Sequence, residues 1–187
     1  MESSKNRTAV EQLKTLVRQK SALALSAMSQ KSDLKIEELS KSEKVMGHWM
    51  SLISVSGDQI HLTFKIQFSV EMARIFAQQT FKHVSHGISN SHSKDFVREL
   101  CNMVAGYLKT TLIHNKINVG VSLPLLCRGF DNFFFDAPSQ ENSGMDAWKL
   151  VHNGTVMYCS TVIELMQDLK LEDLSETSEA TGDVEFL

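Results

Sequence analysis

Two stretches of the sequence each contain a tight-turn signal between two segments that are typical of β-strands. Residues 49–68 are rich in β-branched and aromatic residues and turn at Ser56–Gln59. Residues 148–165 turn at Asn153-Gly154, a pair that supplies the positive φ angles of a type I′ turn. These patterns predict two β-hairpins. Because polar and apolar residues alternate along 60–68, we expect helices to cover only one face of the sheet.

The segments around the hairpins carry helical signals. Thr8 and Glu11 have the spacing of a capping box, so a helix is predicted to begin there. Ser69 is expected to cap a second helix, and the apolar spacing of 94–113 predicts a third. The polar stretch Ser29–Lys44 is compatible with a solvated helix or a linker. Since helix followed by hairpin occurs twice, we predict an α+β domain of two similar halves, with a mainly antiparallel sheet.

The length and charge distribution predict one domain with extra terminal segments. At 187 residues and 42% hydrophobic content, the chain can bury one core but not two ordinary domains. We assign 1–45 to an N-terminal helix and polar linker, and 46–166 to the core. Residues 167–187 hold seven acidic residues against one lysine, so we predict a disordered acidic tail with few residues in the core.

Several classes of protein are disfavoured. No run approaches the roughly 20 apolar residues that cross a bilayer, and the first residues are polar, so we expect a soluble cytoplasmic protein. No clustered basic stripe indicates nucleic-acid binding. Cys101, Cys127 and Cys159 are far apart within apolar runs, and we expect all three to be buried and reduced.

Two clusters outside the predicted helices receive structural interpretations. His83, His86 and His92 share one polar loop, but no carboxylate or cysteine spacing supports them, so no metal site is predicted. Phe130 and Phe133–Phe135 form an aromatic cluster that is more typical of a core or a dimer contact than of a ligand site.

The 94–113 helix has two distinct faces when its residues are projected at about 100° each. Its apolar face comprises Phe96, Leu100, Met103, Val104, Tyr107 and Leu108. The opposite stripe comprises Asp95, Glu99, Asn102, Gly106 and Lys109. A mid-helix asparagine is mildly unfavourable, and a mid-helix glycine costs roughly 1 kcal/mol relative to alanine. Two such residues on one outward stripe indicate that something approaches the helix closely there.

The segment Asp95-Phe-Val-Arg-Glu99-Leu-Cys-Asn102-Met-Val-Ala-Gly106 resembles the signature helix of the CheC, CheX and FliY phosphatases. The likeness extends over about 46–165, from the hairpin before this helix to Val121-Ser-Leu-Pro124 and Arg128-Gly129 after it. CheC-type members carry a second Glu-Asn pair on an earlier helix, whereas CheX-type members carry one. Glu99-x-x-Asn102 is the one such pair in this sequence, so the CheX branch fits better.

This resemblance implies a phosphatase that removes phosphate from the aspartyl group of a CheY-like receiver domain. Asn102 would position the attacking water, and Glu99 would anchor the helix to the receiver's lysine. Asp95, Gly106 and Lys109 would contact the receiver. The chain would need no cofactor of its own, because Mg²⁺ is expected on the receiver partner.

Alternative interpretations stay open at this point. Glutamate and asparagine three residues apart occur on many ordinary solvated helices, and Asp95 is equally explained as a favourable charge in the first helical turn. A binding or adaptor module that holds a receiver without dephosphorylating it is the competing function. The resemblance also implies a homodimer that pairs through its sheets, for which Lys149–Val162 offers potential edge sequence.

Overall fold

The computed structural model describes residues 2–40, 45, 47–129, 142–169 and 171. Its helices are α1 (Glu2–Ser29), α2 (Val70–Ala77) and α3 (Asn90–His114). Its strands are β1 (Lys35–Glu38), β2 (Trp49–Ser56), β3 (Ile60–Phe68), β4 (Gly120–Val121), β5 (Leu125–Arg128), β6 (Ser143–His152) and β7 (Thr155–Leu165). None of the helices within these ranges is long and apolar enough to cross a membrane.

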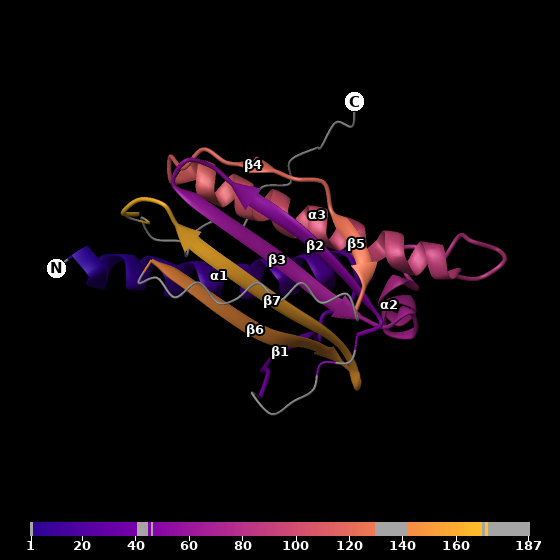
Figure 1. Ribbon diagram of the computed structural model, residues 1–187. Coiled ribbons are helices and arrows are strands. Elements are labelled where there is room, and N and C mark those ends of the chain that lie inside the picture. The colour runs from indigo at the N-terminus through magenta and orange to yellow at the C-terminus, as the bar shows by residue number, and fades with distance from the viewer. Residues whose placement is uncertain (1, 41–44, 46, 130–141, 170, 172–187) are drawn as a thin grey trace.

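The strands form a single antiparallel sheet in the order β1-β6-β7-β3-β2-β4, with β5 also paired to β2 (Figure 1). Both predicted hairpins are confirmed as β2–β3 and β6–β7. Asn153 and Gly154 have φ angles of 46° and 77°, as a type I′ turn requires. The hairpins meet where β3 pairs with β7, so two helix–hairpin units join at the middle of the sheet.

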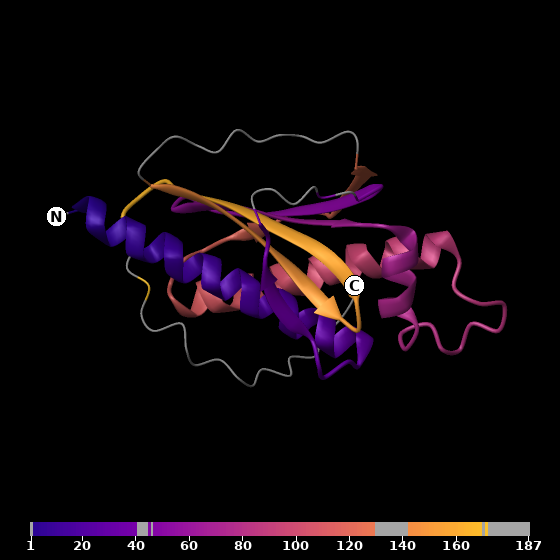
Figure 2. The same ribbon diagram turned by 90° about the horizontal axis from the view of Figure 1, so that it is seen from below.

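The helices α1 and α3 lie on the same face of the sheet (Figure 2). On β3, Leu62, Phe64, Ile66 and Phe68 point to this face and are fully buried. Of their polar neighbours on the other face, His61, Lys65 and Gln67 are partly buried, whereas Thr63 is buried. Burying each large apolar side chain contributes roughly 1.5–3 kcal/mol, which explains why the alternating pattern predicted the covered face correctly.

The helix α1 begins at Glu2, so the predicted start at Thr8 is wrong. Tertiary contacts explain the extra turns at its N-terminal end. Asn6 is 1% exposed, and its amide donates to Asn142 Oδ1 at 3.0 Å and to Asp168 Oδ1 at 2.7 Å. A helical geometry holds this buried side chain against two distant segments, which outweighs the local capping signal.

The strand β1 lies within Ser29–Lys44, the polar stretch for which a solvated helix or a linker was expected. Its four residues are all exposed, so it shows none of the alternation that predicts a strand. It pairs with residues 148–151 of β6, while β7 lies in the middle of the sheet. The expectation that Lys149–Val162 offers a free edge is therefore wrong along most of its length.

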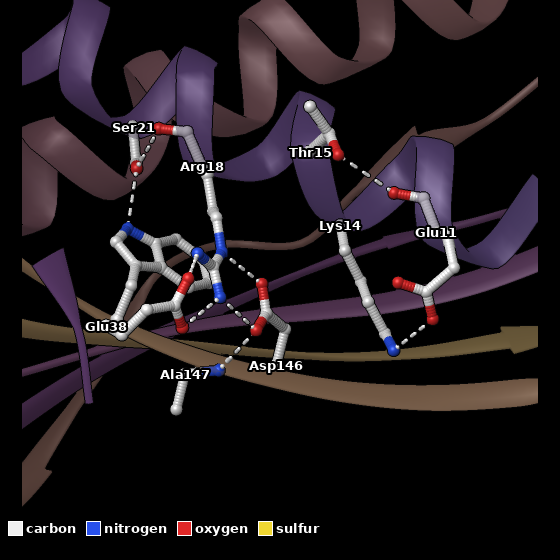
Figure 3. Close-up of polar contacts among 9 residues, drawn as sticks. Glu11, Lys14, Thr15, Arg18, Ser21, Glu38, Asp146 and Ala147 are labelled. Atoms are coloured by element: carbon white, nitrogen blue, oxygen red, sulfur yellow. Dashed lines mark hydrogen bonds and ion pairs between the residues drawn. The ribbon is translucent and has the colours of Figure 1, made fainter. Parts of the chain in front are cut away.

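Arg18 of α1 fastens β1 and β6 to the helix layer (Figure 3). Its guanidinium donates to both carboxylate oxygens of Asp146 at 2.5 and 2.6 Å, and it also pairs with the carboxylate of Glu38. The Trp148 ring lies 5.7 Å from the guanidinium carbon. Hydrogen bonds from Asp146 and then Glu38 raise the pKa of Arg18 above its usual value. The arginine is thus a fixed cation that ties three elements together.

The start of the predicted acidic tail is part of the packed structure. Leu169 is 5% exposed and belongs to the core, and its backbone N–H donates to Asn6 Oδ1 at 3.4 Å. Few residues of the tail were expected to enter the core, and Leu169 is one that does, because it is an apolar side chain within the acidic run. Residues 172–187, like the phenylalanine cluster within 130–141, lie outside the described residues.

The cysteines are free thiols, and two of the three are buried as expected. Burial raises the pKa of the Cys101 thiol to about 12, and burial also raises the pKa of Cys159. Cys127 is only half-buried, contrary to the expectation, because it lies on the short strand β5 near the edge of the sheet.

Candidate functional site

The candidate site lies on α3, whose start is fixed by a capping box. The Ser89 hydroxyl accepts a hydrogen bond from the His92 backbone N–H at 3.2 Å, and His92 Nδ1 accepts from the Ser89 N–H at 3.3 Å. The His92 ring also stacks on Phe81, with 4.9 Å between the centroids. The helix therefore begins at Asn90, four residues before the predicted start. His92 acts as a cap in place of the glutamate or glutamine usual at this position.

The inner face of α3 anchors the helix in the core. It packs against α1, α2 and β2. The buried residues on this face are Phe96, Val97, Leu100, Cys101, Val104, Ala105, Leu108, Thr111 and Leu112. Met103 and Tyr107, which the projection placed on the apolar face, are partly buried at its margin. This anchoring gives the outer side chains a rigid support.

The five residues of the predicted stripe are all exposed on the outer face of α3. They are Asp95, Glu99, Asn102, Gly106 and Lys109. A Cβ placed on Gly106 would meet nothing within 4 Å. The packing of this chain therefore gives no reason for a glycine in mid-helix, and the open space above it is available to a partner.

Glu99 and Asn102 contact one another on this stripe. The Asn102 amide donates from Nδ2 to Glu99 Oε2 at 3.2 Å. An amide has two N–H donors and a carbonyl acceptor, so this bond leaves most of its hydrogen-bonding capacity available to water or to a partner. The carboxylate and the amide thus form one exposed polar pair held by two turns of the same helix.

Asp95 makes its contacts on its own helix. It pairs with Arg98 at 3.1 Å and accepts a hydrogen bond from the Ser91 hydroxyl at 3.4 Å. Because α3 begins at Asn90, Asp95 lies beyond the first turn, so its interpretation as a first-turn charge is wrong. Arg98 was not predicted as a site residue, although its spacing of four from Asn102 places it beside the stripe.

The corresponding spacing on α1 carries a different pair. Lys14 Nζ lies 2.7 Å from Glu11 Oε1, an ion pair three residues apart (Figure 3). A lysine offers no acceptor and brings a positive charge, so it cannot orient a water as an amide does. The carboxylate–amide pair therefore belongs to α3 alone among the three described helices.

The exposure of the site limits the chemistry that it can perform. Glu99 and Asn102 stand on the surface of a helix, and a small-molecule site is normally a concave cleft that encloses its ligand. In the described part of the chain, no three His, Cys, Asp or Glu residues lie close enough to hold a metal ion. An exposed amide and carboxylate are suited to entering the site of another macromolecule.

Comparisons with solved structures define the class of fold. The chain is similar to the chemotaxis protein CheX from Vibrio vulnificus, with a TM-score of 0.64 and 18% identity over 80% of this chain and 97% of that chain. It is also similar to CheX from Desulfovibrio desulfuricans, with a TM-score of 0.58 and 15% identity over 80% and 97% of the two chains. At these identities the likeness establishes a CheC/CheX-like fold.

A complex of CheX and CheY with BeF₃ and Mg²⁺ from Borrelia burgdorferi also matches. Its TM-score is 0.60, with 15% identity over 80% of this chain and 96% of that chain. No curated protein matches the sequence significantly. The family model described as the chemotaxis phosphatase CheX matches residues 49–143, which is just over half of the 187 residues. The chain belongs to the CheX family.

Proposed function

We propose that this protein is a phosphatase that hydrolyses the aspartyl phosphate of a CheY-like receiver domain. The observation that carries the proposal is the exposed Glu99–Asn102 pair on the same stripe of α3 as the unobstructed Gly106. The helix presents two polar side chains, and at Gly106 it has no side chain, so a partner can come close to its backbone. The description of the family as a chemotaxis phosphatase supports this function, as does the CheX–CheY complex from Borrelia burgdorferi.

The proposed mechanism gives Asn102 the role of positioning the attacking water. A receiver holds its acyl phosphate beside its own Mg²⁺ and lysine, which stabilise the negative charge that develops on the phosphoryl group. The missing element is a water held in line with the phosphorus. The amide carbonyl of Asn102 accepts a hydrogen bond from this water, and the amide adds no negative charge beside the phosphoryl oxygens.

Glu99 has the role of an anchor. Its carboxylate would pair with the lysine of the receiver, and this charge-assisted contact would hold α3 in the receiver site. In the free protein the same carboxylate accepts a hydrogen bond from Asn102. Docking on the receiver would therefore draw Glu99 toward the lysine and leave the Asn102 amide to the water. Mg²⁺ belongs to the receiver in this mechanism.

The test of the function is phosphate release from a panel of phosphorylated receivers in the presence of Mg²⁺. The protein is expected to accelerate release from at least one receiver above its intrinsic rate. Acceleration that is absent for every receiver, together with tight receiver binding, would favour the adaptor module. The absence of both would contradict any role at a receiver.

Substitution of Gly106 is expected to change stability and partner binding in opposite directions. Gly106→Ala and Gly106→Gln should raise the free energy of unfolding by about 0.5–1 kcal/mol, because a Cβ meets no other atoms and both residues are better helix formers. Gly106→Gln should weaken receiver binding on the order of tenfold or more, because its side chain occupies the space of the partner.

The two effects are measured by thermal unfolding and by titration with a receiver. Thr15→Gln is a matched control, since Thr15 is exposed on α1, a helix that carries no residue of the stripe. Wild-type receiver affinity in Gly106→Gln would show that nothing approaches the helix at this position.

We also propose that the protein is a homodimer, as the resemblance to CheX implies. The described edges of the sheet are β1 on one side and β4 with β5 on the other, so a sheet-to-sheet pairing would use one of these strands. Sedimentation equilibrium at micromolar concentration is expected to give twice the mass of the chain. A monomer at that concentration would contradict the proposal.

A further inference from the structure

Two cations and one aromatic ring gather beside the candidate site. Lys94 Nζ lies 3.5 Å from the centroid of the Trp49 ring, and the guanidinium carbon of Arg128 lies 5.6 Å from the same centroid. These residues come from α3, β2 and β5, which are far apart in the sequence. Lys94, Trp49 and Arg128 together are called the cationic shelf. The ring attracts a cation through its negative face and holds it in place.

The backbone around the shelf is fixed by close packing. Trp49 and Arg128 are register partners where β2 pairs with β5. The Gly129 N–H donates to the His48 carbonyl at 2.8 Å, and a Cβ at Gly129 would collide with the Gly47 backbone. Glycine is required here because the two segments cross at this short distance. The position of Arg128 beside the ring is therefore set by the fold.

Lys94 carries a charge that the described structure does not neutralise. None of the described carboxylates forms an ion pair with it, and its side chain is partly exposed. Asp95, the neighbouring acid on α3, pairs with Arg98 instead. Among the described residues, Lys94 thus presents a positive charge to whatever contacts this side of α3.

The shelf lies within reach of any protein that docks on Asn102. Lys94, Arg98, Asn102 and Gly106 follow one another at intervals of four along α3 and form one ridge of the helix. Eight residues separate Lys94 from Asn102, a distance of about 12 Å along the axis. A standard interface buries about 800 Å² on each partner, equivalent to a disc of about 16 Å radius. A receiver centred on Asn102 would therefore extend along the helix as far as Lys94.

We infer that the cationic shelf binds carboxylates on the rim of the receiver and contributes to the selection of the receiver. This inference rests on the proposed function. The receiver is the occupant because proteins bind Mg²⁺ through one or two carboxylates, which gives the receiver acidic groups close to its phosphorylation site. Charges at the rim of an interface act mainly on the association rate and on its salt dependence. The shelf is thus a specificity contact, separate from the Glu99–Asn102 pair.

The experiment compares charge reversal at Lys94 with the same reversal at Lys35. Lys35 is exposed on β1, at the opposite edge of the sheet, so K35E changes the net charge equally without touching the shelf. The probe is a CheY-like receiver in its beryllofluoride–Mg²⁺ form, chosen from those that the wild type dephosphorylates. Association rates are measured by stopped flow at about 50 mM and about 500 mM salt, where the screening length falls from about 14 Å to about 4 Å.

K94E is expected to lower the association rate about tenfold relative to K35E at low salt, and the difference should shrink severalfold at high salt. K94Q should lie between the wild type and K94E, and circular dichroism checks the fold of each variant. Equal rates for K94E and K35E would overturn the shelf while leaving the proposed function intact. If the wild type neither binds nor dephosphorylates any receiver, the proposed function fails and the shelf proposal fails with it.

Discussion

Asn102→Ala is expected to abolish the acceleration of receiver dephosphorylation while leaving the fold and most of the receiver affinity intact. The loss of a group that orients the attacking water should lower turnover on the order of 10²-fold, which corresponds to about 3 kcal/mol of barrier. The fold should survive because Asn102 is exposed and its described side-chain bond is to Glu99 on the same helix. The measurement is phosphate release at saturating receiver, with circular dichroism as the check on folding.

Two further variants sharpen the test of Asn102. Asn102→Asp keeps the size of the side chain but places a negative charge beside the phosphoryl group, so it should be as inactive as the alanine variant. Thr15→Ala removes an exposed side chain from α1, away from the stripe, and should retain the wild-type rate. Wild-type turnover in Asn102→Ala would exclude the proposed mechanism.

Glu99→Ala is expected to act on affinity more than on turnover. If Glu99 anchors α3 to the lysine of the receiver, its loss should raise the KM for the phosphorylated receiver about tenfold or more, with a smaller fall in kcat. Glu99→Gln separates charge from hydrogen bonding, because glutamine still accepts a hydrogen bond from Asn102 but cannot form the ion pair. The glutamine variant should therefore resemble alanine in KM. A glutamine variant with wild-type KM would contradict the role of the charge.

The contact between Glu99 and Asn102 predicts how these effects combine. Residues in direct contact usually show coupled effects, with interaction energies of about 0.5–3 kcal/mol. The double variant should be no slower at saturation than Asn102→Ala alone. Glu99 acts mainly on receiver affinity, which does not limit the rate at saturation, and Asn102→Ala has already removed the group that positions the water. Steady-state kinetics of the four proteins in the cycle measure this coupling.

The parts of the fold that the sequence predicted are those in which the local pattern and the packing agree. The alternation along Ile60–Phe68 and the Asn153-Gly154 turn both led to the correct strands. The strand β1 was missed because its four exposed residues carry no alternation, and Arg18 on a distant helix stabilises it. The start of α1 was misplaced because Asn6 is held by residues far along the chain.

The candidate site was predictable to a similar degree. Helical spacing placed Glu99, Asn102 and Gly106 on one outward stripe, because that geometry depends on a single helix. The shelf was not predictable, since the approach of Arg128 to Trp49 depends on the register between β2 and β5. Arg98 lies four residues and Lys94 eight residues before Asn102, but an isolated cation on a helix gives no reason to choose it.

The division of α3 into a buried face and an exposed stripe has an evolutionary consequence. A substitution at Glu99 or Asn102 removes no buried side chain, because both residues are exposed and neither is among the buried residues of α3. Selection for a stable fold therefore does not protect these two positions. A lineage can lose or regain the proposed activity by one or two replacements on this stripe and keep the same scaffold. Proteins with this scaffold can therefore exchange the proposed phosphatase function for receiver binding alone while every intermediate sequence remains folded.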